Sequence, residues 1–74
     1  MEPVLIDRFI VPKEAFAEFT QRMNYNRNFI RKLPGFVRDE AYERTGENGD
    51  RIVITIAVWE SETDIEAAKA AVQL

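Results

Sequence analysis

The chain of 74 residues contains neither cysteine nor histidine. Without cysteine it cannot form a disulfide, and without either residue it has none of the ligands of a Cys/His zinc site. The same absence excludes Ser-His-Asp and Cys-His catalytic arrangements. A domain of this length buries only about 60% of the surface that its unfolded chain exposes, so oligomerisation is the remaining way to add stability.

The chain also lacks long apolar runs, glycine-rich loops and a strong excess of charges of one sign. No apolar run approaches the roughly 20 residues that span a bilayer, and the N-terminus lacks the pattern of a signal peptide. With 13 acidic and 10 basic residues interspersed, the net charge is −3, which does not favour a nucleic-acid surface. The sequence shows no cluster of metal-binding residues. A stretch of basic residues is expected to form a solvated helix face; it consists of Arg22, Arg27, Arg31 and Lys32. We therefore expect a single cytoplasmic domain, residues 1–74, that binds no membrane, nucleic acid or metal.

The most informative stretch is residues 52–59, Ile-Val-Ile-Thr-Ile-Ala-Val-Trp. Its β-branched composition predicts a strand. Neither face of this strand carries a charge, so both must be covered. Helices of the same chain can cover one face, and a second copy of the protein is expected to cover the other. One face carries Ile52, Ile54, Ile56 and Val58, and the other carries Val53, Thr55, Ala57 and Trp59.

A strand and a helix are predicted before this stretch. Val4–Val11 alternates as a strand does, with one charge on each face, Asp7 and Arg8. Residues 12–33 change to helical spacing, although the run Asn24-Tyr25-Asn26 has low helix propensity and predicts a bend or fraying. A Pro-Gly pair then ends the helix. The apolar stripe of the helix consists of Phe16, Phe19, Met23, Ile30 and Leu33.

Residues 36–44 are predicted to be a more polar strand, as is typical of a sheet edge. The following Asn48-Gly49 pair is a strong hairpin signal, which makes this strand antiparallel to residues 52–59. Ser61 is expected to cap a second helix, with Asp64 completing an approximate capping box. The apolar positions of that helix are Ile65, Ala68 and Val72.

The order β-α-β-β-α predicts an α+β fold of the ferredoxin-like split βαβ type. A right-handed crossover makes the first two strands parallel with a gap between them. Residues 52–59 fill that gap, giving an antiparallel sheet with helices on one face. The sequence stops at Leu74 without a capping glycine or a further element, so we expect the final strand to be missing and the domain to be truncated at its C-terminus.

Three segments resemble the antibiotic-biosynthesis monooxygenase family of dimeric α+β barrels. They are Asp7-Arg8-Phe9-Ile10-Val11-Pro12, Leu33-Pro34-Gly35-Phe36 and Val58-Trp59-Glu60-Ser61. The resemblance implies a homodimer in which two sheets pack face to face. It also implies a cofactor-independent monooxygenase that acts on a small aromatic substrate of the quinol or anthrone type. The alternative is a non-catalytic homodimer of the same fold, either a small-ligand-binding protein or a structural one.

Two branches of that family differ from this chain at informative positions. Haem-degrading members resemble it at Asp7, where they carry Asn, and at Trp59, but their haem-ligating histidine has no counterpart here. Haem is therefore disfavoured, and no cofactor is expected. The anthrone oxygenases often carry an Asn four residues before the tryptophan, where this chain has Thr55.

The candidate site combines these positions. Thr55 and Trp59 share a strand face by parity, and with Asp7 on the same side all three would lie beneath Phe19 and Met23. Such a pocket would hold one carboxylate and one indole N–H among apolar groups, as ligand sites usually do. In the enzyme hypothesis Asp7 is the catalytic base, while Trp59 positions the aromatic ring or donates a hydrogen bond to its oxygen.

Structural explanations compete with each of these roles. Trp59 would serve equally as a core residue, and a small Thr55 would let the helices approach the sheet. Asp7, set between apolar neighbours, is expected either to pair with an arginine or to handle a proton. The arginines available for that pair are Arg38, Arg44 and Arg51.

Overall fold

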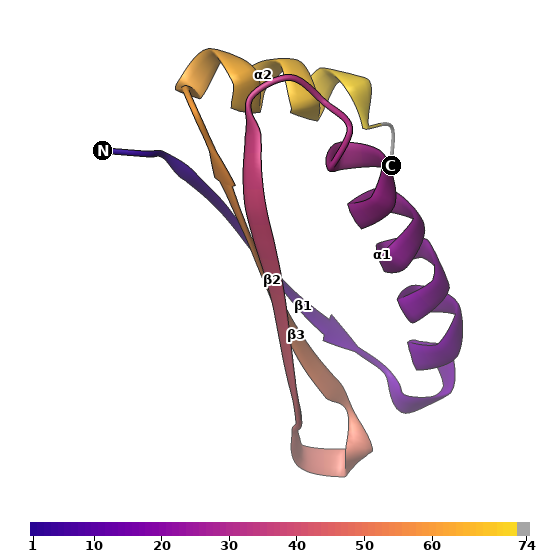
Figure 1. Ribbon diagram of the computed structural model, residues 1–74. Coiled ribbons are helices and arrows are strands. Elements are labelled where there is room, and N and C mark those ends of the chain that lie inside the picture. Colours follow the sequence, from indigo (N-terminus) through magenta and orange to yellow (C-terminus); the bar gives the residue numbers. More distant parts are fainter. Residues whose placement is uncertain (73–74) are drawn as a thin grey trace.

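In a computed structural model that describes residues 1–72, the most apolar strand occupies the centre of a three-stranded sheet, and two α-helices lie against one face (Figure 1). The predicted α+β, ferredoxin-like order of elements is therefore confirmed. The chain end at Leu74 lies outside the described residues. The elements are β1 (Val4–Val11), the 3-10 turn η1 (Lys13–Ala15), α1 (Phe16–Ile30), β2 (Phe36–Thr45), the 3-10 turn η2 (Glu47–Gly49), β3 (Arg51–Trp59) and α2 (Glu62–Ala71).

The sheet order is β1-β3-β2, and both neighbours of β3 run antiparallel to it. Strands β1 and β2 are consequently parallel to each other, as the right-handed crossover predicts. Asp7 of β1 lies opposite Thr55 of β3, and Asp39 of β2 lies opposite Ala57. Thus Asp7 and Asp39 lie on opposite sides of the central strand, on the face that the helices cover.

The first helix differs from the prediction at its beginning and in its middle. It does not start at Pro12, whose ψ of 144° is extended; a 3-10 turn intervenes, and α1 begins at Phe16. The predicted bend at residues 24–26 is wrong, since one α-helix runs unbroken through them to Ile30. Packing of the inner face of α1 outweighs the weak local propensity of that run.

The second helix begins as predicted, with one change in its cap. The hydroxyl of Ser61 accepts a hydrogen bond from the backbone N–H of Asp64 at 3.1 Å. The Asp64 carboxylate does not close a capping box on the Ser61 backbone; it accepts the Ser61 hydroxyl proton, at 2.8 Å. Ile65 and Ala68 of α2 are then buried, at 3% and 4% exposure.

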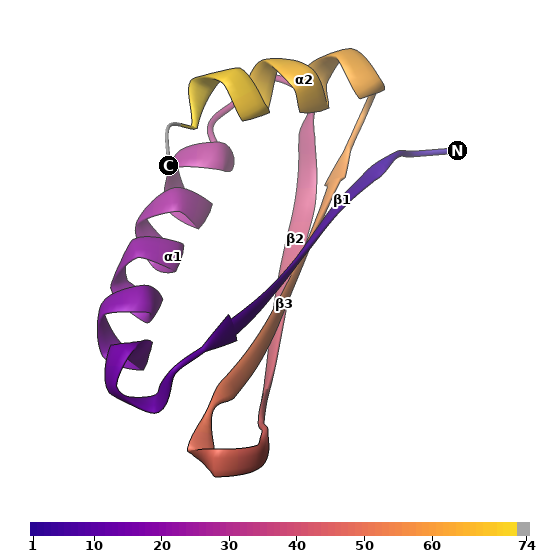
Figure 2. The same ribbon diagram turned by 180° about the vertical axis from the view of Figure 1, so that it is seen from behind.

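The core lies between the helices and β3. Trp59 is only 1% exposed, and its ring meets Phe36 edge to face, with centroids 5.5 Å apart. Helix α1 runs along the sheet and α2 crosses its end, both on the same side (Figures 1 and 2). The opposite face of the sheet has no helix over it within residues 1–72. Several apolar side chains there are accordingly exposed: Val4 at 49%, Ile6 at 58% and Ile10 at 60%.

Candidate functional site

A cavity of about 540 Å³ lies between the sheet and the two helices. Its wall is mostly apolar, with a few charged groups from both helices, β1 and β2, which is the usual composition of a small-molecule site. A second hollow, of about 490 Å³, lies beside the edge strand β1 but contains neither Trp59 nor Thr55. Strand residues in the main cavity include Leu5, Asp7, Phe9, Asp39, Thr55, Ala57 and Trp59, and helix residues include Phe19, Met23, Asn26, Arg27, Ile30 and Ala68.

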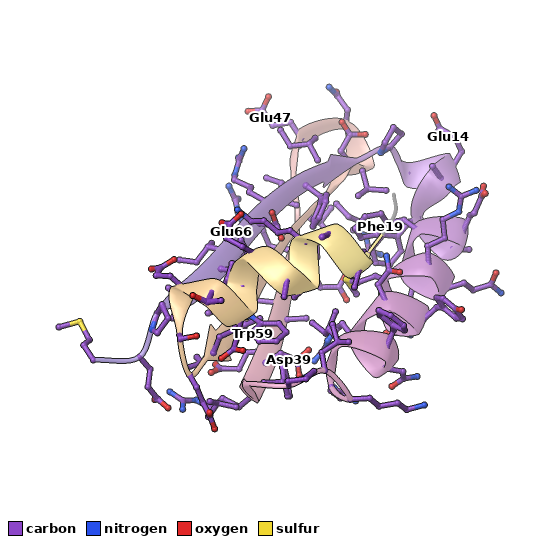
Figure 3. All side chains as sticks on the ribbon, turned by 90° about the horizontal axis from the view of Figure 1, so that it is seen from above. Glu14, Phe19, Asp39, Glu47, Trp59 and Glu66 are labelled. Atoms are coloured by element: carbon purple, nitrogen blue, oxygen red, sulfur yellow. The ribbon has the colours of Figure 1, made fainter. Side chains whose placement is uncertain are left out.

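The five residues selected from the sequence all line this one cavity. Asp7, Thr55 and Trp59 come from the sheet, and Phe19 and Met23 come from α1. Figure 3 shows Trp59 beneath α2 and Phe19 projecting from α1 towards the sheet. The placement follows from strand parity, which puts alternate residues of β1 and β3 on the helix-covered face. The catalytic and binding roles suggested for these residues stay predictions.

Asp7 differs from its predicted surroundings. It is exposed, at the edge strand β1 of the sheet. The expected arginine pair does not form: Arg51 bonds to Glu43 at 3.1 Å, and Arg38 lies 3.7 Å from Glu2. Asp7 has no ion pair among the described residues. Its side chain therefore lies at the solvent-exposed part of the cavity wall.

Trp59 combines nearly complete burial with an unused hydrogen-bond donor. Its indole Nε1 is buried and has no acceptor within residues 1–72. A buried donor without a partner costs roughly 1–3 kcal/mol relative to a paired one. A ligand oxygen that reached this N–H would supply the missing acceptor.

A partly buried ion pair in the same cavity wall was not predicted from the sequence. Arg27 Nε donates to Asp39 Oδ2 at 2.5 Å, and the two side chains are only 22% and 7% exposed. Arg31 Nε adds a longer contact, 3.3 Å, to Asp39 Oδ1. The prediction of a solvated basic face is thus wrong for Arg27, although it holds for Arg22, whose side chain is 77% exposed and pairs with Glu18.

This pair has a clear electrostatic consequence. Burial alone would raise the pKa of Asp39, but the hydrogen bond and charge of Arg27, assisted by Arg31, outweigh it and hold that pKa below its usual 3.8. Asp39 therefore stays ionised at neutral pH. Two guanidinium groups share this one carboxylate, so the cluster keeps an excess positive charge.

A helical spacing signal could have identified Arg27. It lies four residues after Met23 and three before Ile30, two positions that face inward, so it shares their side of the helix. On β2, Asp39 lies two residues from Ala41, and both share the face that the helices cover. The small Ala57 opposite Asp39 leaves room for the arginine.

Other site chemistries find less support in the part of the chain that the structure describes. It contains no group of three or more acidic residues that could hold a metal ion. No helix in it is long and apolar enough to cross a membrane.

Together these features define a class of protein, a small ferredoxin-like α+β domain with a ligand-sized cavity between its sheet and helices. Comparison with family models then identifies the family. The model for antibiotic biosynthesis monooxygenases matches residues 4–73, and the chain belongs to that family. Comparisons with curated proteins and with solved structures gave no match.

Proposed function

We propose that this protein is a cofactor-independent monooxygenase acting on a small aromatic substrate of the quinol or anthrone type. The observation that carries the proposal is the juxtaposition of Asp7, Thr55 and Trp59 in one cavity of about 540 Å³. That volume lies within the roughly 300–1,000 Å³ range of small-molecule sites. Membership of the monooxygenase family supports the reaction class.

The proposed reaction requires only a general base and an apolar surface that holds the substrate and excludes water. For an anthrone, Asp7 would accept the proton that converts the substrate into its electron-rich enolate, which donates electrons to dioxygen. One oxygen atom becomes the new carbonyl and the other leaves as water with the two displaced hydrogens. The substrate supplies all four electrons that reduce dioxygen, so no external reductant is required. The apolar wall around Trp59 would hold the ring and exclude water.

The test is oxygen consumption with a panel of anthrones and quinols. We expect uptake with at least one of them, and Asp7→Asn should lower turnover by about a hundredfold or more, the usual contribution of a general base. Glu47→Gln, in the exposed turn between β2 and β3, removes a similar charge away from the cavity and should leave the rate unchanged. An absence of uptake with every compound, or an unaltered rate in Asp7→Asn, would contradict the proposal.

The second candidate is a non-catalytic ligand-binding homodimer of the same fold. Thr55 favours it, because the family's anthrone oxygenases often carry an asparagine there and a threonine lacks its amide. Under this hypothesis an aromatic ligand would perturb Trp59 fluorescence without any oxygen uptake.

We further propose that two copies pair through the open sheet face. The exposed Val4, Ile6 and Ile10 continue the apolar surface of β3. The subunit exposes 5464 Å², whereas a compact monomer of 8.6 kDa would expose about 4,700 Å². The excess, roughly 800 Å², is about what each partner buries in an interface of standard size. A two-fold axis would bury the same face against itself.

Light scattering at micromolar concentration tests this assembly. We expect a mass of twice the chain. A folded species with the mass of a single chain would contradict the proposal.

A further inference from the structure

The ion pair in the cavity wall leaves part of Arg27 unused. Only its Nε is occupied by Asp39, and the two terminal amino groups have no acceptor among the described residues. They are not fully buried either, since the buried polar side-chain atoms without partners belong to Thr20 and Trp59. The end of the guanidinium therefore keeps accessible donors, in a residue that lines the cavity.

Charge and orientation both favour an anion at this end. Arg27 and Arg31 share the single carboxylate of Asp39, so the cluster has a surplus positive charge. Asp39 also fixes the guanidinium, which reduces the entropy that a ligand would otherwise lose in ordering it. An arginine held in this way suits a planar carboxylate, which can accept two parallel hydrogen bonds.

The sheet register adds a length requirement. Asp39 lies beside Ala57 on one side of β3, and Asp7 lies beside Thr55 on the other side. Neighbouring strands are about 4.8 Å apart, so β1 and β2 are separated by about 10 Å. A fused aromatic system of two or three rings spans that width.

We infer that the cavity takes a fused-ring aromatic carboxylate, and that the terminal amino groups of Arg27 bind its carboxylate while the rings extend past Trp59 towards Asp7. This inference rests on the proposed function and names the substrate class for the same site. A ring carboxylate is ionised at neutral pH, whereas a simple phenol is not. Arg27 thereby becomes the residue that selects the substrate.

The test compares binding of 2-naphthoate with that of 2-naphthamide, a neutral analogue of nearly the same shape. Because the chain has one tryptophan, its indole N–H gives a single peak in a proton–nitrogen correlation spectrum, and that peak reports occupancy directly. We expect wild type to bind naphthoate at least about tenfold more tightly than naphthamide, as a charge-assisted hydrogen bond implies. Arg27→Gln should remove this preference and leave the affinity for naphthamide nearly unchanged.

A control comes from the turn that follows the same helix. Lys32 is exposed there and lies outside the cavity lining, so Lys32→Gln removes a positive charge and should keep the preference. If Arg27→Gln fails to fold because Asp39 loses its main partner, the double variant Arg27→Gln/Asp39→Asn provides a neutral pair, with the same loss expected.

Three results would overturn the inference. They are equal affinities for the two ligands in wild type, a preference that persists in the double variant, and a preference that disappears in Lys32→Gln instead. Oxygen uptake is measured separately. A protein that binds naphthoate through Arg27 but oxidises nothing would refute the proposed reaction and leave this binding assignment intact.

Discussion

Replacing Trp59 by alanine removes one of the two most buried side chains in the described part of the protein, each 1% exposed. A buried tryptophan covers roughly 150–250 Å², worth about 4–6 kcal/mol at 25 cal/mol per Å². Alanine retains a little of that area, so we expect a loss of about 3–5 kcal/mol in the free energy of unfolding. A domain of this length has a total stability of only about 4–11 kcal/mol, and the variant should be close to unfolding.

Urea unfolding followed by far-ultraviolet circular dichroism measures this loss, since the variant has no tryptophan fluorescence. Protein concentration must be the same throughout, because a dimer's stability depends on it. Trp59→Phe keeps a ring against Phe36 and gives up an N–H that has no acceptor within residues 1–72, so it should cost only about 1–2 kcal/mol. Tyr25→Ala, at a position 74% exposed, should change stability by under about 0.5 kcal/mol. A loss below about 1 kcal/mol in Trp59→Ala would refute the reasoning and show that Trp59 borders the cavity without filling the core.

Further changes test other parts of the structure. Ile54→Lys puts a charge in the middle of the open sheet face. Light scattering should therefore show loss of the proposed dimer, and circular dichroism should show unfolding of the subunit. An intact dimer would contradict the proposed interface. Because the folded-state pKa of Asp39 is lowered, its stabilising contribution is complete above about pH 4 and is lost as pH falls through that folded pKa. Asp39→Asn should therefore lower the free energy of unfolding by about 1–3 kcal/mol at pH 7 and reduce its dependence on pH in the acid range. Parallel plots of unfolding free energy against pH for wild type and variant would show that the ion pair contributes nothing. Gly35 has a φ of +83°, and an added Cβ would overlap the Asp64 carboxyl group, so Gly35→Ala should clearly lower the urea concentration at the unfolding midpoint. Gly46 has a negative φ, so Gly46→Ala serves as a control with a smaller expected effect. Equal effects of the two substitutions would contradict this explanation.

Local patterns in the sequence were sufficient to predict the elements and their pairing. The uncharged faces of residues 52–59 indicated a central strand, and the polar residues 36–44 indicated an edge. Both features follow from burial, which acts on each strand separately. Parity also placed Thr55 and Trp59 on one face, because alternation along a strand is a local property. The strand register, in which Asp7 lies opposite Thr55, adds Asp7 to that face.

Element boundaries and polar partners depended on the assembled chain. The sequence predicted a first helix over residues 12–33, whereas α1 covers only Phe16–Ile30. A proline at position 12 can precede a 3-10 turn as well as an α-helix, so the local sequence did not distinguish the two. It also assigned Asp7 a buried environment, which only the position of α1 relative to the edge strand could decide.

By itself, the sequence determined the β-α-β-β-α order, the central position of β3 and the shared face of Thr55 and Trp59, because hydrophobic periodicity specifies which side of each element is buried. Only the tertiary structure decided that Arg27 turns inward to Asp39 and that Asp7 has no ion pair within residues 1–72. The reason is physical: Arg27 and Asp39 are twelve residues apart on different elements, and an ion pair forms only where packing brings two charges within contact and removes water from between them.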